Sequence, residues 1–188
     1  MINYEKALKL YTESGYEQGV ANCLNSMAVT YQEQGNYPLA LKYHNKALSL
    51  AEKNKDSIGI ARSFHNIAAI YKRQKKYDKA LTLYFKALAF FESKKNKNNI
   101  GAVKNSIAGV HALIGQYDTA LKFLNESLAI SKKLNDEAQI TECLNNLGDI
   151  HISLKNYPEA LNYYGKAKNI NIEINNQLGL ISSYIGLA

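Results

Sequence analysis

The sequence predicts an all-α solenoid, in which antiparallel helix hairpins stack one on the next. Three observations predict this fold class: an internal period of 40 residues, helical spacing of the apolar residues inside each period, and a near absence of helix breakers. Of the 188 residues, 46% are hydrophobic and 21% are charged, which is typical of a folded globular chain, and only 2 are proline.

The period is visible at several aligned positions. A tyrosine followed three residues later by alanine and leucine recurs at Tyr37-x-x-Ala40-Leu41, Tyr77-x-x-Ala80-Leu81, Tyr117-x-x-Ala120-Leu121 and Tyr157-x-x-Ala160-Leu161. An apolar residue followed by a small one recurs upstream, at Met27-Ala28, Ile67-Ala68, Ile107-Ala108, Leu147-Gly148 and Leu187-Ala188. A spacing kept at so many positions indicates repeated copies of one structural unit.

Each unit is predicted to form two helices joined by a short turn. The first helix carries an apolar stripe at Val20, Leu24, Met27, Ala28 and Tyr31, and the second carries one at Ala40, Leu41, His44, Ala47, Leu48 and Ala51. Between them, Gly35 and its equivalent Gly115 suit the left-handed residue that ends a helix, while Asn36 and Asn156 suit a cap or the turn itself. One hairpin cannot bury both stripes, so the hairpins are expected to stack.

The predicted organisation is one solenoid over residues 1–188. It comprises a half repeat at 3–15 (a second helix), full repeats at 20–59, 60–99, 100–139 and 140–179, and the start of a further repeat at 180–188. Tyr4-Glu5-Lys6-Ala7-Leu8 matches the start of a second helix. Near the other end, Ile181, Ile185 and Leu187 are apolar where a terminal repeat normally has a polar capping surface. This predicts either a longer protein or open ends that self-associate with another copy.

The repeat resembles a known family. The resemblance to the tetratricopeptide repeat is carried by the run Ser26-Met27-Ala28-x-x-Tyr31-x-x-x-Gly35-x-Tyr37-x-x-Ala40-Leu41, which ends at Ala47-Leu48, and it covers essentially the whole chain. Two features depart from the usual pattern. The period is 40 rather than about 34, and no proline follows the second helix, where Glu52, Glu92, Lys132 and Ile172 stand.

The longer variety of this repeat is similar to those of kinesin light chains, Pins-type spindle adaptors, and bacterial Rap-type and histidine-kinase-linked sensors. These arrays bind proteins. The resemblance implies a right-handed superhelix of about ten helices whose first helices line a concave groove.

No motif in the sequence points to catalysis, a metal or a cofactor. The sequence has no His-Glu-x-x-His, no Cys-x-x-Cys and no Gly-rich phosphate loop. Two of the four histidines, His111 and His151, occupy the position of Tyr31 and Tyr71, which predicts packed side chains rather than metal ligands. The two cysteines, Cys23 and Cys143, are predicted to be small buried residues rather than a disulfide. We therefore expect no enzyme activity from this segment.

The candidate binding residues lie mostly on the first helices, at positions opposite the apolar stripe. One recurring position reads Asn25, His65, Asn105 and Asn145, and the next reads Ser26, Asn66, Ser106 and Asn146. A carboxamide donates and accepts at once, so a ladder of them can pair with the peptide groups of an extended ligand. Asparagine is a poor helix former, and its recurrence in register indicates either ligand binding or hydrogen bonding between helices. The candidate set is completed by Arg62, Lys72, Arg73 and Asp149.

The charge pattern bears on the partner. The net charge is +7 and the pI is about 9.2, and Arg62, Lys72 and Arg73 would favour an acidic ligand in one part of the groove. The basic residues are spread along the chain without interleaved aromatic residues, which favours a solvated surface over nucleic-acid binding.

The leading function predicted is a protein–protein interaction module that holds a peptide or partner domain in the groove. The alternative is a sensory or regulatory segment of a larger bacterial signalling protein, such as a histidine kinase or transcription regulator, and nucleic-acid binding is the least favoured. No signal peptide and no membrane-spanning segment is evident, which predicts a cytoplasmic location.

Overall fold

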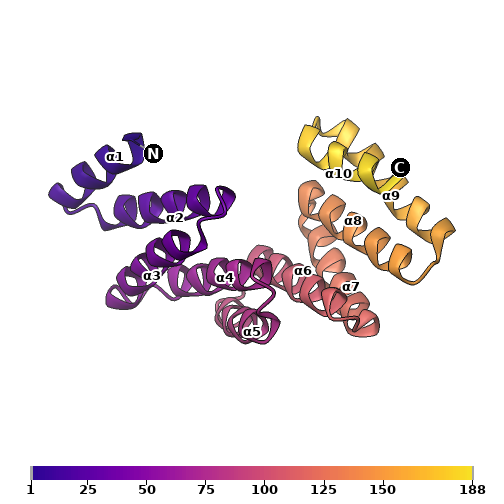
Figure 1. Cartoon of the computed structure of the whole chain (residues 1–188), viewed down its shortest axis with the longest axis horizontal. Helices are drawn as coiled ribbons and strands as arrows, with labels where there is room; N and C mark the ends of the chain where they lie inside the picture. The colour runs from indigo at the N-terminus through magenta and orange to yellow at the C-terminus, as the bar shows by residue number, and fades with distance from the viewer. Residues whose placement is uncertain (1, 188) are drawn as a thin grey trace. The chain divides into compact units, whose positions relative to one another are not determined.

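The computed structural model describes residues 2–187 of the chain. These residues form ten helices and no strand, which confirms the predicted all-α class (Figure 1). Not one helix within residues 2–187 combines the length and the apolar character needed to cross a membrane. The chain divides into two compact units, 1–94 and 95–188.

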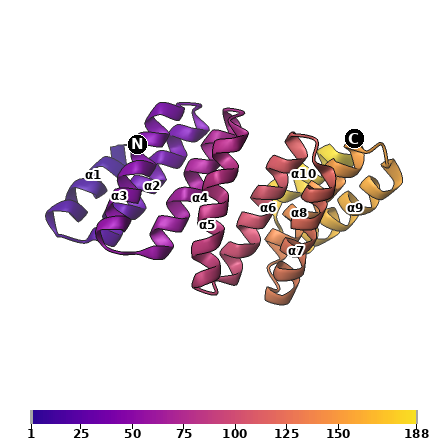
Figure 2. The same ribbon diagram turned by 90° about the horizontal axis from the view of Figure 1, so that it is seen from below.

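The first unit holds five helices. Their bounds are α1 (Ile2–Glu13), α2 (Glu17–Glu33), α3 (Tyr37–Lys53), α4 (Ser57–Arg73) and α5 (Tyr77–Ser93). The helices of each hairpin, α2 with α3 and α4 with α5, run side by side, as Figure 2 shows for α4 and α5. Successive hairpins pack through α3 and α4, and α1 packs on α2.

The second unit repeats the same arrangement. Its helices are α6 (Lys97–Leu113), α7 (Tyr117–Leu134), α8 (Glu137–Ser153), α9 (Tyr157–Glu173) and α10 (Gln177–Leu187). Hairpins α6–α7 and α8–α9 pack through α7 and α8, and α10 packs on both α8 and α9. The first helices α6 and α8 also contact each other, so α6, α8 and α10 form one continuous surface, which we call the first-helix face of the second unit.

Every turn between consecutive helices contains one residue with left-handed backbone geometry, with φ between 52° and 78°. These residues are Gly15, Gly35, Lys55, Lys75, Lys95, Gly115, Asn135, Lys155 and Asn175. In the α2–α3 turn the Gly35 amide donates to the Gln32 carbonyl and the Asn36 amide donates to the Tyr31 carbonyl, which satisfies the last carbonyls of α2. The left-handed geometry predicted for Gly35 and Gly115 is therefore present, and the same turn also forms where the residue is lysine or asparagine.

Side-chain caps start several helices. Asn36 Oδ1 accepts from the Leu39 amide at 3.2 Å, as predicted, whereas Asn156 at the equivalent position makes no such bond. Asp56 and Asp136 cap α4 and α8 by accepting from Gly59 and Gln139.

Small residues let the two helices of a hairpin approach closely. The alanines at 28, 68, 108, 40, 80, 120 and 160 are fully buried. A larger residue from the second helix fills the space beside them, and it is buried in each full repeat at His44, Tyr84, Leu124 and Tyr164. This alternation of small and large side chains is the close packing expected inside a solenoid.

Helix α1 is aligned differently from the prediction. Its turn residue Gly15 is equivalent to Lys55, so Tyr4 is equivalent to His44, and α1 corresponds to the later part of a second helix rather than its start. The sequence was ambiguous because the motif Tyr-x-x-Ala-Leu occurs twice in one second helix, at Tyr77 and again at Tyr84. Tyr4 is 39% exposed where its equivalents are buried.

Candidate functional site

The second unit has a pocket of about 570 Å³ between α8 and α10, which we call the α8–α10 pocket. It is lined by Glu142, Asn145, Asn146, Asp149 and Ile152 of α8, Tyr164 of α9, and Ser182, Ile185 and Gly186 of α10. Three of the predicted binding residues, Asn145, Asn146 and Asp149, thus lie together in it. Its volume falls within the range of about 300–1,000 Å³ found for ligand sites.

Asn146 is held from behind by a neighbouring first helix. Its side-chain nitrogen donates to Asn105 Oδ1 at 2.8 Å, and Asn105 on α6 is only 3% exposed. Asn105 therefore lies beneath the surface, where it fixes the orientation of Asn146. Because an amide nitrogen carries two hydrogens, Asn146 keeps one further N–H and its carbonyl oxygen with which to pair.

Asn145 is held by a second chain of polar contacts. Asn176 donates to Asn171 Oδ1, Asn171 donates to Ser183 Oγ, and Ser183 Oγ lies 3.1 Å from Asn145 Oδ1, to which it can donate. Asn171 and Ser183 are fully buried. This network ties α10 to α8 and α9 and orients the carboxamide of Asn145 at the pocket.

Asp149 is oriented by Tyr164. The phenol hydroxyl donates to Asp149 Oδ1 at 2.6 Å, while the tyrosine residue is 2% exposed. The pKa of Tyr164 is raised, mainly by burial and to a smaller extent by the hydrogen bond to Asp149. The phenol therefore stays a hydrogen-bond donor throughout the physiological pH range. The ring fits because Gly148 and Gly186 face it, and a Cβ at Gly148 would lie 2.5 Å from a ring carbon.

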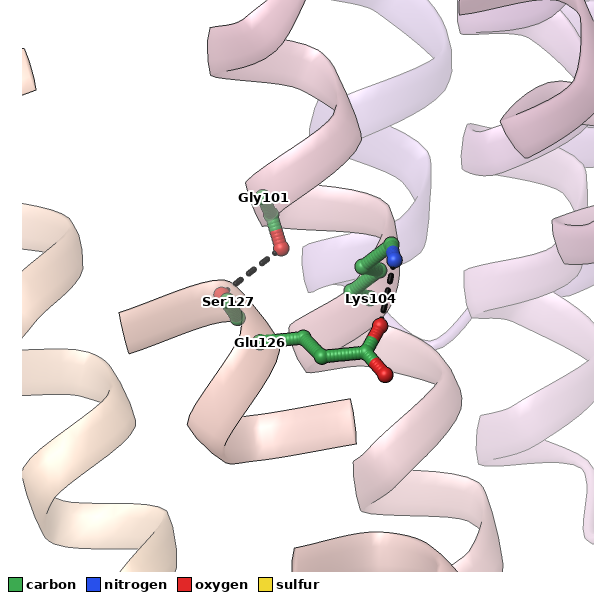
Figure 3. A network of polar contacts seen from close by, with 4 residues as sticks. All are labelled: Gly101, Lys104, Glu126 and Ser127. Carbon is green, nitrogen blue, oxygen red and sulfur yellow. Dashed lines mark hydrogen bonds and ion pairs between the residues drawn. The ribbon is translucent and has the colours of Figure 1, made fainter. Parts of the chain in front are cut away.

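The α6–α7 hairpin that presents Asn105 is secured by the contacts in Figure 3. Ser127 Oγ of α7 donates to the Gly101 carbonyl of α6 at 2.8 Å, and one turn further along α6, Lys104 pairs with Glu126. Ser127 Oγ also lies 3.2 Å from the Cys143 sulfur on α8. Burial raises the pKa of the Cys143 thiol to about 11, and both Cys143 and Cys23 are free and buried, as structural cysteines are.

The predicted residues of the first unit make contacts within their own hairpins. Asn25 Oδ1 lies 3.1 Å from His44 Nδ1, and His65 contacts the ring of Tyr84 with the ring centroids 5.3 Å apart. Burial lowers the pKa of His65, opposed by a hydrogen bond with the Asn66 side chain. Two members of the predicted ladder, Asn25 and Asn105, thus use their carboxamides to bond to side chains of other helices. A ligand-binding role for these two residues stays a prediction.

The three basic residues of α4 do not form one cluster. Arg62 lines a small pocket near the start of α4 together with Asn25, whereas Lys72 and Arg73 lie in its last turn. Arg62 and Lys72 are ten positions apart on the helix, about 15 Å along the axis. Another pocket of the first unit, of about 400 Å³ among α3, α4 and α5, contains none of the predicted site residues.

The structure places the remaining histidines as packing residues. His111 stacks on Phe123 and His151 stacks on Tyr163, and both side chains are half-buried. Within residues 2–187, no three side chains of His, Cys, Asp or Glu are grouped so that they could hold a metal ion.

Part of the α8–α10 pocket was absent from the predicted set, namely Glu142, Ile152, Tyr164, Ser182, Ile185 and Gly186. The two on α8 carried a usable signal. Glu142, Asn145, Asn146, Asp149 and Ile152 follow one another at steps of three, one, three and three, which places them on one side of a helix. Tyr164 and Ile185 gave no such signal, because they join the site only through packing between helices.

Fold and repeat together define the class of this molecule, a helical-repeat protein built from tandem hairpins. The chain belongs to the tetratricopeptide repeat family, whose sequence pattern matches residues 2–53, 19–93, 59–133 and 99–173. A search of curated protein sequences finds no match.

Several solved structures have the same fold. BtubC (BKLC) from P. vanneervenii is 21% identical, with a TM-score of 0.73 over 93% of this chain and 75% of that one. A signal transduction ATPase with numerous domains from Pyrococcus horikoshii, which has a tetratricopeptide repeat sensor, is also 21% identical, with a TM-score of 0.76. The match covers 96% of this chain but 28% of that protein. The apo form of RapI is 22% identical, with a TM-score of 0.69 over 97% of this chain and 71% of RapI.

Proposed function

We propose that this chain is a non-enzymatic protein-interaction module that binds a peptide, or an extended segment of a partner domain, in a groove lined by first helices. In the second unit the binding site is the α8–α10 pocket. The observation that carries the proposal is the convergence of Asn145, Asn146 and Asp149 on one pocket, each oriented by a separate hydrogen bond with a residue of a neighbouring helix.

Peptide recognition suits the chemistry of these side chains. The N–H and carbonyl oxygen that remain on Asn146 match the carbonyl and N–H of a peptide group. Because Asn105, Ser183 and Tyr164 hold the three side chains in place, little rotamer freedom is lost on binding, which favours affinity. The proposal needs no cofactor, and it places the chain in the cytoplasm.

The test starts from peptides selected for binding to the 188-residue chain from a random peptide display library. Affinities of the enriched peptides are then measured by fluorescence anisotropy for the wild-type chain and for Asn145→Ala and Asn146→Ala. Loss of one hydrogen bond per variant is expected to weaken binding about threefold to tenfold.

The matched control is Asn169→Ala, an exposed asparagine on the second helix α9. It should leave the affinity unchanged, and circular dichroism should show that all three variants stay helical. Peptides that bind all variants equally well would contradict the assignment of the site to the α8–α10 pocket.

A second candidate function is a sensory segment within a larger signalling protein. Its support is the structural likeness to the sensor-bearing ATPase of P. horikoshii, of which the chain spans only 28%. The full-length reading frame tests it: an adjoining kinase, ATPase or DNA-binding region is expected, and a frame that stops at Ala188 would contradict it.

Two further parts of the proposal concern the partner. The basic residues of α4, Arg62, Lys72 and Arg73, would favour acidic segments at the first unit, and self-association would proceed through α1 and α10. Light scattering across a concentration series tests the second point, since a constant monomer mass would contradict it.

Nucleic-acid binding remains the least favoured function, and an affinity for DNA that is insensitive to salt would count against it.

A further inference from the structure

We propose that the α8–α10 pocket accepts a basic side chain, lysine or arginine, of the bound peptide. This inference rests on the proposed function and deepens it, because it names the residue type that the pocket selects. It is carried by the charge of the pocket lining, by the fixed orientation of one carboxylate and by the apolar surfaces beside that carboxylate.

The charged residues of the pocket lining have one sign. Glu142 and Asp149 are acidic, and no lysine or arginine is among the lining residues. Both carboxylates are on α8, seven positions and about 10 Å apart along the axis, and the two asparagines lie between them. A cation entering the pocket therefore meets two acidic residues and no basic one in the lining.

This local sign differs from that of the molecule as a whole. Residues 1–94 contain 14 basic and 8 acidic residues, whereas residues 95–188 contain 9 basic and 8 acidic ones, so almost all of the net charge of +7 belongs to the first unit. The second unit is close to neutral, and its pocket is an acidic site on a neutral background. Long-range repulsion of a basic ligand by the second unit itself is accordingly small.

Asp149 is pre-positioned to receive a cation. The buried hydroxyl of Tyr164 holds Oδ1 at 2.6 Å, and the ring of Tyr164 lies between Gly148 and Gly186, where a larger residue would not fit. The carboxylate is thereby fixed at the pocket before the ligand arrives, although Asp149 itself is exposed to solvent. Orientation in advance makes a charge-assisted hydrogen bond less costly to form.

The apolar surfaces of the pocket suit the stem of a long basic residue. Ile152 on α8 is 42% exposed and Ile185 on α10 is 73% exposed, and both line the same pocket as Asp149. Lysine and arginine side chains combine an aliphatic stem with a charged end, so the stem can cover Ile152 and Ile185 while the cation reaches Asp149. A short or acidic side chain would satisfy neither surface.

The first experiment uses small probes and does not depend on any selected peptide. N-acetyl-arginine methylamide, N-acetyl-norleucine methylamide and N-acetyl-glutamate methylamide are titrated at millimolar concentrations into chain labelled at isoleucine methyl groups, with NMR detection. The arginine probe is expected to shift the Ile152 and Ile185 signals and to bind more tightly than the norleucine probe, while the glutamate probe leaves them unchanged.

Asp149→Asn should weaken binding of the arginine probe about threefold to fivefold, the effect of one exposed ion pair. The control Asp118→Asn, an exposed acidic residue at the start of α7, should leave it unchanged. Equal binding of all three probes, preference for the glutamate probe, or no shift with the arginine probe would each overturn the inference.

A second arm separates this inference from the proposed function. In each selected peptide that depends on Asn146, every lysine or arginine is replaced in turn by norleucine or citrulline. A basic position whose replacement weakens binding to the wild-type chain but not to Asp149→Asn supports the inference. Peptides that need Asn146 yet carry no sensitive basic residue overturn the inference and leave the proposed function standing, whereas peptides indifferent to Asn145 and Asn146 overturn the proposed function.

Discussion

Tyr164 shows how much one side chain can organise in a repeat of this kind. Its ring fills the space left by Gly148 in its own hairpin and by Gly186 in α10, and its hydroxyl reaches Asp149. The equivalent positions of the other full repeats pair a buried alanine with His44, Tyr84 or Leu124. The glycine at 148 is therefore a local adjustment that accompanies the orientation of Asp149.

Replacing Gly148 by alanine is expected to destabilise the protein by about 1–3 kcal/mol, because the added methyl group overlaps the Tyr164 ring. Urea unfolding followed by circular dichroism measures the change in the free energy of unfolding. The matched control is Gly165→Ala, which meets open space in the interior of α9 and is expected to stabilise by about 0.5–1 kcal/mol. If both variants gained stability, the contact between position 148 and Tyr164 would be refuted.

His44 makes stability depend on pH. It is fully buried, and burial lowers its pKa from 6.5 to about 4. Its Nδ1 is the nitrogen that carries the proton, since it donates to Asn25 while Nε2 is buried with no hydrogen-bond partner among the described residues. Below pH 6.5 the unfolded chain takes up a proton that the folded chain refuses, so the free energy of unfolding is expected to fall between pH 6.5 and about pH 4, by up to about 3 kcal/mol.

The variant His44→Leu tests this expectation, since Leu124 occupies the equivalent position of another repeat. Denaturant titrations at pH 7 and pH 4.5 should show a smaller loss of stability in the variant than in the wild type. A residual slope will remain, because burial lowers the pKa of His65 as well. An identical slope in both proteins would show that His44 is not the group that titrates.

At the scale of helices, the α6–α7 hairpin replaces a packing arrangement by an ion pair. Where other repeats have Leu24, Phe64 or Leu144, the third has Lys104, and where they have Lys46, Lys86 or Lys166, it has Glu126. All three of those lysines lie over aromatic rings of their own hairpin, Lys46 over Tyr43, Lys86 over Phe64 and Lys166 over Tyr163. Each hairpin therefore has one lysine at these two positions. The other position holds an apolar residue in three repeats and the paired Glu126 in the third repeat.

Removing one partner of this pair is expected to destabilise, because the other charge is left partly covered. Lys104 has a side-chain exposure of 16%, and Lys104→Ala should lower the free energy of unfolding by about 1–3 kcal/mol. The double variant Lys104→Leu/Glu126→Lys restores the residue types of the other repeats and should recover most of that loss. A double variant that is less stable than Lys104→Ala would contradict this explanation of the pair.

The sequence predicts these helices well and their polar contacts poorly, for a physical reason. Apolar periodicity and turn residues repeat in every unit, so each repeat supports the assignment of the others, and even Lys75 and Lys155 adopt the left-handed geometry first recognised at glycine. A carboxamide, in contrast, pairs equally well with a ligand or with another helix. Asn105 and Asn146 looked alike in the sequence, and only the packing of α6 against α8 makes one the buried support of the other.

At the scale of the whole molecule, protection against hydrogen exchange should vary along the chain. None of residues 3–13 in α1 is buried, and Ser183 is the one buried residue of α10, whereas α6 has six buried residues and α8 has seven. In a linear repeat array each element is stabilised by its neighbours, so α1 and α10 are expected to exchange fastest and α6 and α8 slowest. Exchange followed by mass spectrometry measures this, and uniform protection would contradict it.

The turns have a consequence at the level of the gene. Their left-handed residues follow one another every twenty positions from Gly15 to Asn175, and each hairpin begins and ends in the same backbone geometry. Unequal crossing-over between equivalent codons would add or delete forty residues while joining two ends that already fit. Such an array can change its length one hairpin at a time, and with it the number of first helices that face a ligand, without passing through an unfolded ancestor.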